Sequence, residues 1–468
     1  MKVEQIYTGC LAEAAYYIES EGEAAIIDPL RETQPYIERA EADGATIKYV
    51  LETHFHADFV SGHLDLAKKT NAAIVFGPTA QPNFKAHVAK DGEVLKLGKV
   101  SIIVLHTPGH TMESSTFLLR DENGVDYALF TGDTLFLGDV GRPDLAVKTD
   151  LSREDLAGHL YDSLRNKIMP LADEVIVYPG HGAGSACGKK MSKETWGTLG
   201  AQKQVNYALR ADMTRTEFVK EVTTGLVDPP QYFPKNAVMN KMGYESFDEV
   251  RNRALQALSV RAFKAAWAEE DALVIDTRPQ DEFAKGFIPG SIFIGIDDTF
   301  APWVGALVPD LKQAILFIAD AGREDEIVTR LARVGYDNAI GYLEGGFAAW
   351  QEASEEQDQI SEIAAEDFAK IYNSSINLLD ARRVSEYETQ HVQGAINFPL
   401  DFISHNMSNI DREKLYYVHC AGGYRSMIAV SILKSRGFTN IINIQGGFKA
   451  LQTTNLPLSE LVEQATEL

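Results

Sequence analysis

Short apolar runs alternate with amphipathic segments over residues 1 to about 190, and most of the runs are closed by Gly, Pro or Asp. Apolar spacing of helical period predicts helices over Pro35–Ala42 and Asp155–Ile168. We expect Pro35 at the first helical position and Ser152 as the N-cap of the second helix, with Asp155 completing its cap. The expected buried strands are Ala24–Asp28, Ile47–Glu52, Ala73–Phe76, Val100–Leu105, Tyr127–Phe130 and Glu174–Tyr178.

The second half of the chain contains an internal repeat. Val274–Phe283 reappears as Leu378–Tyr387, and Leu343–Phe347 reappears as Ile444–Phe448. Each copy runs strand, turn, helix, strand, loop, helix, which is typical of a parallel sheet covered by helices. The sequence therefore predicts three α/β domains: 1–250 with a helical extension after about 190, and two copies at 251–355 and 360–468.

Composition and charge narrow the class of protein. The 468 residues are 45% hydrophobic and 24% charged, as in ordinary globular proteins. A net charge of −23 argues against nucleic acid or an anionic membrane as a partner, because both require a basic face. Three scattered cysteines suit a reducing compartment, and neither a signal peptide nor a membrane span is expected. Together these features predict a cytoplasmic enzyme.

Metal-ligand side chains follow four of the expected strands. His54, His56 and Asp58 lie directly after Ile47–Glu52. His110, Asp133 and His181 each lie just past the end of a later strand, next to glycines. Because loops at strand ends carry the chemistry of α/β proteins, these side chains are expected to meet at a metal site.

These segments resemble the metallo-β-lactamase superfamily. The chain carries Thr107–Thr111 (TPGHT), Thr131–Leu135 (TGDTL) and Pro179–His181 (PGH) in the superfamily's order, after the opening cluster. The resemblance implies an αββα sandwich. Phe59 stands where the superfamily's binuclear hydrolases have a further histidine, so we expect one metal per chain.

His54, His110 and Asp133 form a set of two histidines and one carboxylate, as in non-haem Fe(II) oxygenases. Within the superfamily the set resembles that of the persulfide dioxygenases, which implies Fe(II). His56, Asp58 and His181 would then stand beside the metal or act as further ligands. Zinc is the alternative metal, in a mononuclear thioesterase similar to the glyoxalase II branch. Arg142 and Cys187 are candidate substrate-binding residues.

A second chemical centre follows the strand that ends at His419. Cys420 is followed by Gly422, Gly423 and Arg425, and a helix is expected to begin there. Inward backbone N–H groups, the helix N-terminus and the arginine would stabilise a thiolate and bind the transferred sulfur. The segment resembles the rhodanese family, which implies that Cys420 and Arg425 are catalytic. In the first copy Asp320 stands in place of the cysteine, which predicts an inactive domain.

Together the two centres resemble the fusion of a persulfide dioxygenase with rhodanese domains. The expected partners are a low-molecular-weight persulfide, O₂ and sulfite, with thiosulfate as the product. The sequence does not identify the carrier thiol, which could be glutathione, coenzyme A, bacillithiol or inorganic polysulfide. If the chain forms a homo-oligomer, the middle domain is a natural place for the contacts between subunits. The alternatives are the zinc thioesterase with a rhodanese domain and a sulfur-binding module without turnover.

Overall fold

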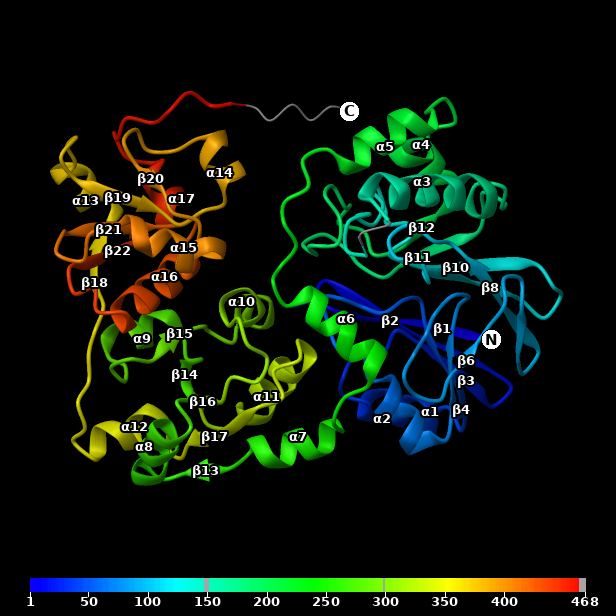
Figure 1. Ribbon diagram of the computed structural model, residues 1–468, viewed down its shortest axis with the longest axis horizontal. Helices are drawn as coiled ribbons and strands as arrows, with labels where there is room; N and C mark the ends of the chain where they lie inside the picture. The colour runs from blue at the N-terminus through cyan, green and yellow to red at the C-terminus, as the bar shows by residue number, and fades with distance from the viewer. Residues whose placement is uncertain (147–150, 298, 463–468) are drawn as a thin grey trace. The chain divides into compact units, whose positions relative to one another are not determined.

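The computed structural model describes residues 1–146, 151–297 and 299–462. The described chain forms two compact units, shown in Figure 1. Unit 1 comprises Met1–Val250 with Thr329–Asp337, and unit 2 comprises Arg251–Val328 with Asn338–Leu468. No helix among the described residues is both long and apolar enough to cross a membrane.

Unit 1 contains two six-stranded sheets. The first has the order β1 (Lys2–Thr8), β2 (Glu13–Ser20), β3 (Glu23–Ile27), β4 (Thr46–Glu52), β5 (Ala73–Phe76) and β6 (His87–Val88). The second has the order β12 (Gly197–Thr198), β11 (Ile176–Pro179), β10 (Asp126–Gly132), β9 (Ser115–Arg120), β8 (Val100–His106) and β7 (Val94–Leu97). β3, β4 and β5 are parallel, as are β10 and β11, so their carboxyl ends share one edge of each sheet.

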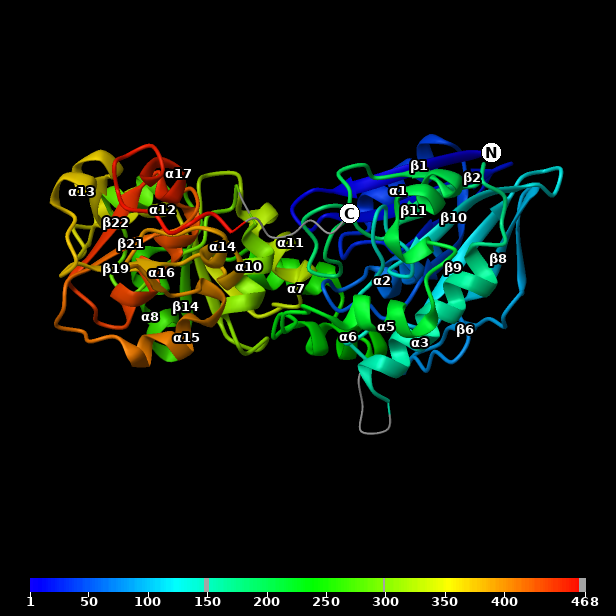
Figure 2. The same cartoon turned by 90° about the horizontal axis from the view of Figure 1, so that it is seen from above.

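The helices of unit 1 cover the outer faces of both sheets, as Figures 1 and 2 show. The first sheet is covered by α1 (Gln34–Ala42) and α2 (His63–Thr70), and the second by α3 (Arg153–Ser163) and α5 (Arg215–Thr223). Between the sheets, apolar side chains of both meet in one core that includes Tyr16, Ile27, Val104, Phe117 and Phe130. The result is the expected αββα sandwich, a stack of four layers.

The apolar pattern located the parallel strands β3, β4, β5, β10 and β11 within two residues of their ends, but not the short parallel strand β6. It missed β1 and β2, where polar and apolar residues do not alternate clearly, and the antiparallel strands β7 and β9. Ser152 and Asp155 form the expected capping box, and α3 continues as a π-helical turn over Leu164–Ile168. Pro35 is the second residue of α1, not the first, because the helix begins at Gln34.

The remaining helices of the first 254 residues form the expected helical extension. They are α4 (Leu199–Val205), α6 (Phe233–Met242) and α7 (Phe247–Ala254). Asn240 of α6 is buried and binds the loop that follows β4. Its amide N–H groups donate to the carbonyl oxygens of His56 and Phe59, each at 2.8 Å, so this helix fixes the loop carrying the candidate ligands.

Unit 2 contains two five-stranded parallel sheets that repeat one another. The first is β13 (Ala257–Leu258), β17 (Ala339–Leu343), β16 (Ile315–Ile318), β14 (Leu273–Asp276) and β15 (Ile292–Phe293). The second is β18 (Ser361–Ala364), β22 (Ile441–Gln445), β21 (Tyr416–His419), β19 (Asn377–Asp380) and β20 (Ile396–Asn397). The two strand orders are the same, which confirms the duplication.

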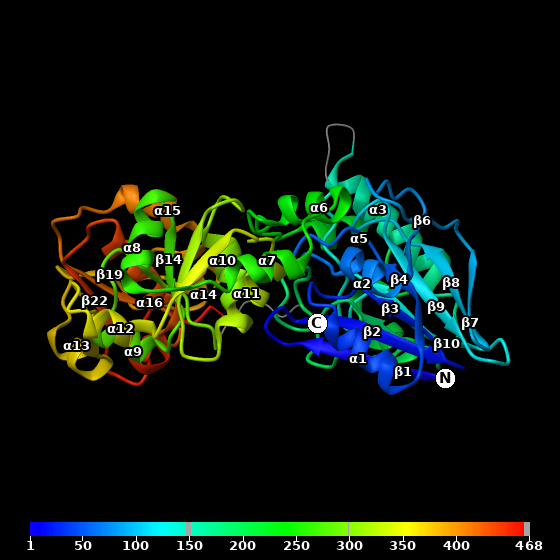
Figure 3. The same ribbon diagram turned by 90° about the horizontal axis from the view of Figure 1, so that it is seen from below.

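Helices accompany both of these sheets, as seen in Figures 1 and 3. In the first copy they are α8 (Val260–Glu269), α9 (Gln280–Lys285), α10 (Phe300–Leu307), α11 (Glu324–Arg333) and α12 (Gly346–Glu352). In the second they are α13 (Ala365–Ile371), α14 (Val384–Thr389), α15 (Ile403–Asn406), α16 (Tyr424–Ser435) and α17 (Gly447–Leu451). The copies touch through α16, where Ser431 Oγ accepts a hydrogen bond from the backbone N–H of Phe293 at 2.9 Å.

The repeat extends to a buried ion pair after the second strand in sequence of each copy. Arg278 binds Asp276 and Arg382 binds Asp380, and the shortest contact is 2.6 Å in both. Each guanidinium also stacks on the phenylalanine of the late Gly-Gly-Phe segment, Phe347 in one copy and Phe448 in the other. The same ion pair and ring contact therefore support this turn in both copies. The copies differ instead in the loop that follows the central strand, which carries Asp320 in the first copy and Cys420 in the second.

Candidate functional site

Three strand-end loops of unit 1 bring three of the predicted ligands together. His54 follows β4, His110 follows β8 and Asp133 follows β10, and all three side chains are buried. Their ligand atoms lie within 4.8 Å of one another. The two imidazoles are nearly perpendicular, with ring centroids 4.9 Å apart. Three residues distant in sequence therefore form one compact set of two nitrogens and one carboxylate.

Hydrogen bonds orient the two imidazoles of this set. His110 Nδ1–H donates to the carbonyl of Arg142 at 2.9 Å, which leaves Nε2 facing Asp133 Oδ2 at 3.4 Å. His54 Nδ1 lies 3.0 Å from Thr53 Oγ1, and that hydroxyl donates to Asp28 at 2.8 Å. The hydroxyl hydrogen is committed to Asp28, so the imidazole is the donor and its Nε2 is left for a metal.

The donors fit a metal ion. Both carboxylate oxygens of Asp133 are buried, and neither has a hydrogen-bond partner among the described residues. Burial, and then the neighbouring His56, His110 and His181, lower the pKa of His54 well below its usual value, so it is the neutral imidazole that metals bind. A buried carboxylate without a partner is costly, and a cation would remove that cost.

His56 is turned toward two other acids. Its Nε2 lies 3.1 Å from Asp28 Oδ1 and 3.6 Å from Glu52 Oε2, in a buried group separate from the set just described. Burial lowers the pKa of His56, but the carboxylates of Asp28, Glu52 and Asp58 outweigh it and raise this pKa to about 10. Asp28 and Glu52 were not predicted as site residues, although both stand at strand ends, which was the signal used for the others.

Asp58, His181 and Cys187 form a separate buried group whose ligand atoms also lie within 4.8 Å of one another. His181 Nδ1–H donates to the carbonyl of Ala12, and its Nε2 lies 3.3 Å from Asp58 Oδ2. Phe59 is fully buried and packs against the His56 ring, with centroids 4.2 Å apart. The side chain at position 59 therefore lies beside His56 and offers no ligand atom.

The Arg142 guanidinium is committed to protein groups. It pairs with both carboxylate oxygens of Asp144, at 2.7 and 2.8 Å, and donates to the carbonyl of Ala186 at 3.3 Å. The backbone N–H of Arg142 donates to the carbonyl of Cys187 at 3.0 Å. These contacts give Arg142 a structural role in holding the Cys187 loop next to His110, while its role toward substrate stays a prediction.

In unit 2 the loop between β21 and α16 forms a cradle around Cys420. The backbone N–H of Gly423 donates to Cys420 Sγ at 3.1 Å. Gly423 has a φ of +120°, which side chains other than glycine rarely adopt, so this inward N–H depends on glycine. Arg425 is held by Glu386 through two hydrogen bonds of 2.6 and 2.8 Å.

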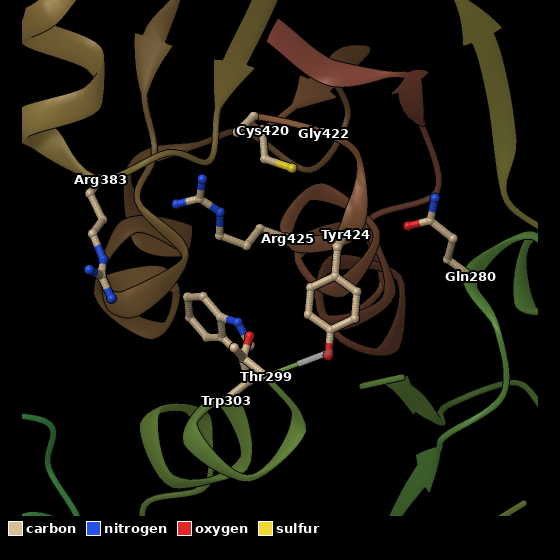
Figure 4. A pocket seen from close by; sticks show the side chains of 9 residues that line it. Gln280, Thr299, Trp303, Arg383, Cys420, Gly422, Tyr424 and Arg425 are labelled. Atoms are coloured by element: carbon tan, nitrogen blue, oxygen red, sulfur yellow. The ribbon is translucent and has the colours of Figure 1, made fainter. Parts of the chain in front are cut away.

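A cavity of about 430 Å³ opens over Cys420, and both copies contribute to its wall. Figure 4 shows Arg425 and Arg383 on one side of the cysteine, with Trp303 and Thr299 of the first copy facing the same space. The lining residues are Gln280, Thr299, Trp303, Arg383, Cys420, Ala421, Gly422, Tyr424 and Arg425. The sequence indicated the cysteine, the glycines and Arg425, but carried no signal for the residues of the first copy.

The corresponding loop of the first copy, between β16 and α11, carries Asp320 in place of a cysteine. Its arginine, Arg323, pairs with Glu326 and Asp297. A carboxylate cannot form a persulfide, so this loop offers no sulfur nucleophile.

Comparison with family models covers both parts of the chain. The model described as "Metallo-beta-lactamase superfamily" matches residues 8–181, and that described as "Rhodanese-like domain" matches residues 259–353 and 364–454. The first match contains all six predicted metal-site residues. The second contains Asp320 in one copy and Cys420 in the other.

Relatives and a solved structure agree with these matches. A structure titled as a metallo-beta-lactamase from Staphylococcus aureus is 33% identical, with a TM-score of 0.66, over 73% of this chain and 99% of that one. A probable hydroxyacylglutathione hydrolase of Schizosaccharomyces pombe is 32% identical over 38% of this chain and 66% of its own length. The human mitochondrial persulfide dioxygenase ETHE1 is 30% identical over 34% of this chain and 59% of its own length.

Proposed function

Because this chain belongs to the metallo-beta-lactamase superfamily and carries two rhodanese-like domains, we propose that it oxidises a low-molecular-weight persulfide and transfers sulfur through Cys420. The observation that carries the proposal is the pairing of two centres in one chain. One is the buried set of His54, His110 and Asp133, and the other is the cradled thiol of Cys420. The proposed domains are 1–250, 251–355 and 360–468, and the proposed location is the cytoplasm.

The set of two histidines and one carboxylate supports Fe(II), because three ligands on one side leave positions open for two reactants. When bound, such an ion would allow O₂ to accept electrons from the sulfane sulfur, which is the species oxidised. The balanced reaction is RSSH + O₂ + H₂O giving RSH, sulfite and two protons. The part of this chain is to hold the ion with His54, His110 and Asp133, and to exclude bulk water by burial.

Cys420 performs the second step. Its thiolate attacks the outer sulfur of a second persulfide, giving the Cys420 persulfide and RSH. Sulfite then attacks the outer sulfur of that persulfide, which releases thiosulfate and restores the thiolate. The Gly423 N–H and the Arg425 guanidinium stabilise negative charge on the sulfur during both transfers.

The dioxygenase step is tested on full-length protein purified without oxygen. We expect the protein to contain up to one equivalent of iron per chain and to take up oxygen when glutathione persulfide is added. Comparison with the coenzyme A and bacillithiol persulfides then identifies the carrier thiol. A protein that holds no iron and consumes no oxygen contradicts the proposal.

The likeness to the S. pombe protein makes thioester hydrolysis the second candidate function. Turnover of S-lactoylglutathione without oxygen would establish it.

The sulfurtransferase step is tested with Cys420→Ser. We expect sulfur transfer from thiosulfate to fall to background, because Asp320 cannot replace the thiol in the first copy. Oxygen uptake with a persulfide is expected to persist, which serves as the folding control. Sulfur transfer that persists in Cys420→Ser would show that another group carries the sulfur.

A further inference from the structure

The buried face of α6 is polar. Its buried side chains are Phe233, Asn236 and Asn240, although asparagine is mostly an exposed residue in proteins. Asn240 is satisfied, because its amide N–H groups bind the loop after β4 and its Oδ1 accepts from the backbone N–H of Ser61 at 2.9 Å. Asn240 therefore has a structural role, and Asn236 needs a separate explanation.

Asn236 is fully buried with both ends of its amide unpaired. Neither Nδ2 nor Oδ1 has a hydrogen-bond partner among the described residues. Burying an amide without partners is costly, and an apolar side chain of similar size, such as leucine, would avoid that cost. The position thus offers two donors and one acceptor to a molecule other than this chain.

Asn236 lies between two residues that reach the loops of the candidate metal site. Residues four apart share a helix face, and one turn after Asn236 comes Asn240, which binds the loop after β4. One turn before it, the carbonyl of the buried Tyr232 accepts from the Asn236 backbone N–H at 3.0 Å. Burial, and then the charges of Asp58 and Cys187, raise the pKa of the Tyr232 hydroxyl, so this hydroxyl lies within electrostatic reach of both. The Asn236 amide therefore stands beside the metal-site loops.

The chemical complement of a free amide is a second amide. Such a partner accepts from Nδ2 and donates to Oδ1, whereas a sulfur anion or sulfite accepts from Nδ2 and leaves Oδ1 unpaired. Glutathione, coenzyme A and bacillithiol each bear an amide on the second carbon from the sulfur. Inorganic polysulfide and free cysteine have no amide. The unpaired side chain thus separates two classes of carrier.

We propose that Asn236 recognises the carrier thiol by pairing with the amide next to its sulfur-bearing carbon. The substrate class is then an amide-bearing persulfide, and neither inorganic polysulfide nor cysteine persulfide. The inference rests on the proposed function for the persulfide group, while the amide pairing itself requires no oxygen. Residues 226–230, which lead into α6, form no helix or strand, so entry of the carrier requires no regular element to unfold there. α6 also lies outside residues 8–181, which match the superfamily model.

The test compares two thiols that differ in one group. N-acetylcysteine and 3-mercaptopropionate share the thiol, the carboxylate and the carbons between them, but only the first bears an amide. Their binding to full-length Cys420→Ser protein, purified and titrated without oxygen, is measured by calorimetry. We expect N-acetylcysteine to bind at least about tenfold more tightly, because the other thiol leaves the Asn236 amide unpaired. Equal affinities, or no binding of either thiol, overturn the proposal, since a buried water on Asn236 gives no such preference.

Adding Asn236→Leu to that parent assigns the preference. We expect the two affinities to come within about twofold of each other, through weaker binding of N-acetylcysteine and unchanged binding of 3-mercaptopropionate. The midpoint of thermal unfolding should not fall, because the variant removes an unpaired buried amide. Val238→Ala, at an exposed position of the same helix, is the matched control and should keep the preference. A preference that persists in Asn236→Leu would assign amide recognition to another residue.

The comparison in the parent decides the proposal even where a variant does not fold. It also separates this inference from the proposed function. A protein that prefers N-acetylcysteine but takes up no oxygen with a persulfide would contradict the dioxygenase step and support amide recognition.

Discussion

At the scale of single residues, the Glu386–Arg425 pair controls the charge next to Cys420. Burial would raise the pKa of Glu386, but its hydrogen bonds with Arg425 outweigh burial and lower this pKa below the ordinary value of 4.5. A lowered carboxyl pKa means that the pair stabilises the fold above about pH 4.5 and is lost as the pH falls through the folded-state pKa. Arg425 is thus fixed at neutral pH and released in acid.

We therefore predict that sulfur transfer declines on acidification below about pH 4.5 and that Glu386→Gln removes this acid limb. At neutral pH the variant should already be about tenfold slower, the effect of one charge-assisted hydrogen bond. The measurement is the pH profile of thiosulfate sulfurtransferase activity. Glu388→Gln, an exposed neighbour on the same helix, is the matched control. An acid limb that persists in Glu386→Gln would assign it to another group.

At the scale of secondary-structure elements, the close approach of β11 to β10 sets the position of Asp133. A Cβ at Gly180, just past the end of β11, would lie 2.9 Å from Asp133 Oδ1 and 3.1 Å from the Gly132 carbonyl carbon. The second contact is to backbone, which cannot move aside cheaply. Glycine at position 180 is therefore needed for the two strands to present Asp133 to the metal ligands.

Gly180→Ala is accordingly expected to displace the Asp133 carboxylate and to lower bound metal by at least half. An overpacking cost of about 1–3 kcal/mol should also lower the midpoint of thermal unfolding. Metal analysis together with a thermal melt checks both effects. Gly9→Ala is the control, because a Cβ there would meet nothing within 4 Å. Full metal content in Gly180→Ala would mean that the strands have room to separate.

The arrangement of strands and loops also explains which parts of the candidate site could be predicted from the sequence. His54, Asp133 and His181 were predictable because parallel strands bring their carboxyl ends to one edge of each sheet, whatever the loops do. His110 was predictable from its place just past a strand, although β8 pairs antiparallel with both of its neighbours. The partner of each side chain was not predictable. Cys187 lies on a loop that is held by Arg142 and by Asp139, which accepts from the backbone N–H groups of Lys189 and Lys190. Neither strand periodicity nor ligand spacing indicates where such a loop folds back. The pairing of His56 with Asp28 and Glu52 was hidden for the same reason.

At the scale of the whole molecule, duplication gives the copy without a cysteine a place beside the Cys420 loop. Trp303 of α10 and Arg383 before α14 line the same 430 Å³ cavity as Cys420. That volume lies in the range of small-molecule pockets and exceeds what a sulfite anion needs, so it has room for the organic persulfide of the proposed function. An aromatic face and a second guanidinium would bind its body and a carboxylate. We therefore expect the first copy, although it lacks a cysteine, to contribute to substrate selection.

This arrangement predicts that Trp303→Ala and Arg383→Ala raise KM about tenfold for a carboxylate-bearing persulfide such as glutathione persulfide, the loss of one charge-assisted or aromatic contact. Transfer from inorganic thiosulfate should change less than about threefold, because that donor needs only the Cys420 loop. Steady-state kinetics with both donors give the comparison, and Arg436→Ala, an exposed arginine of the same copy, is the control. Equal increases in KM for both donors would mean that Trp303 and Arg383 support the Cys420 loop and do not bind the carrier thiol. Residues that bind the organic part of the donor affect only the KM for the organic persulfide, because thiosulfate has no such part.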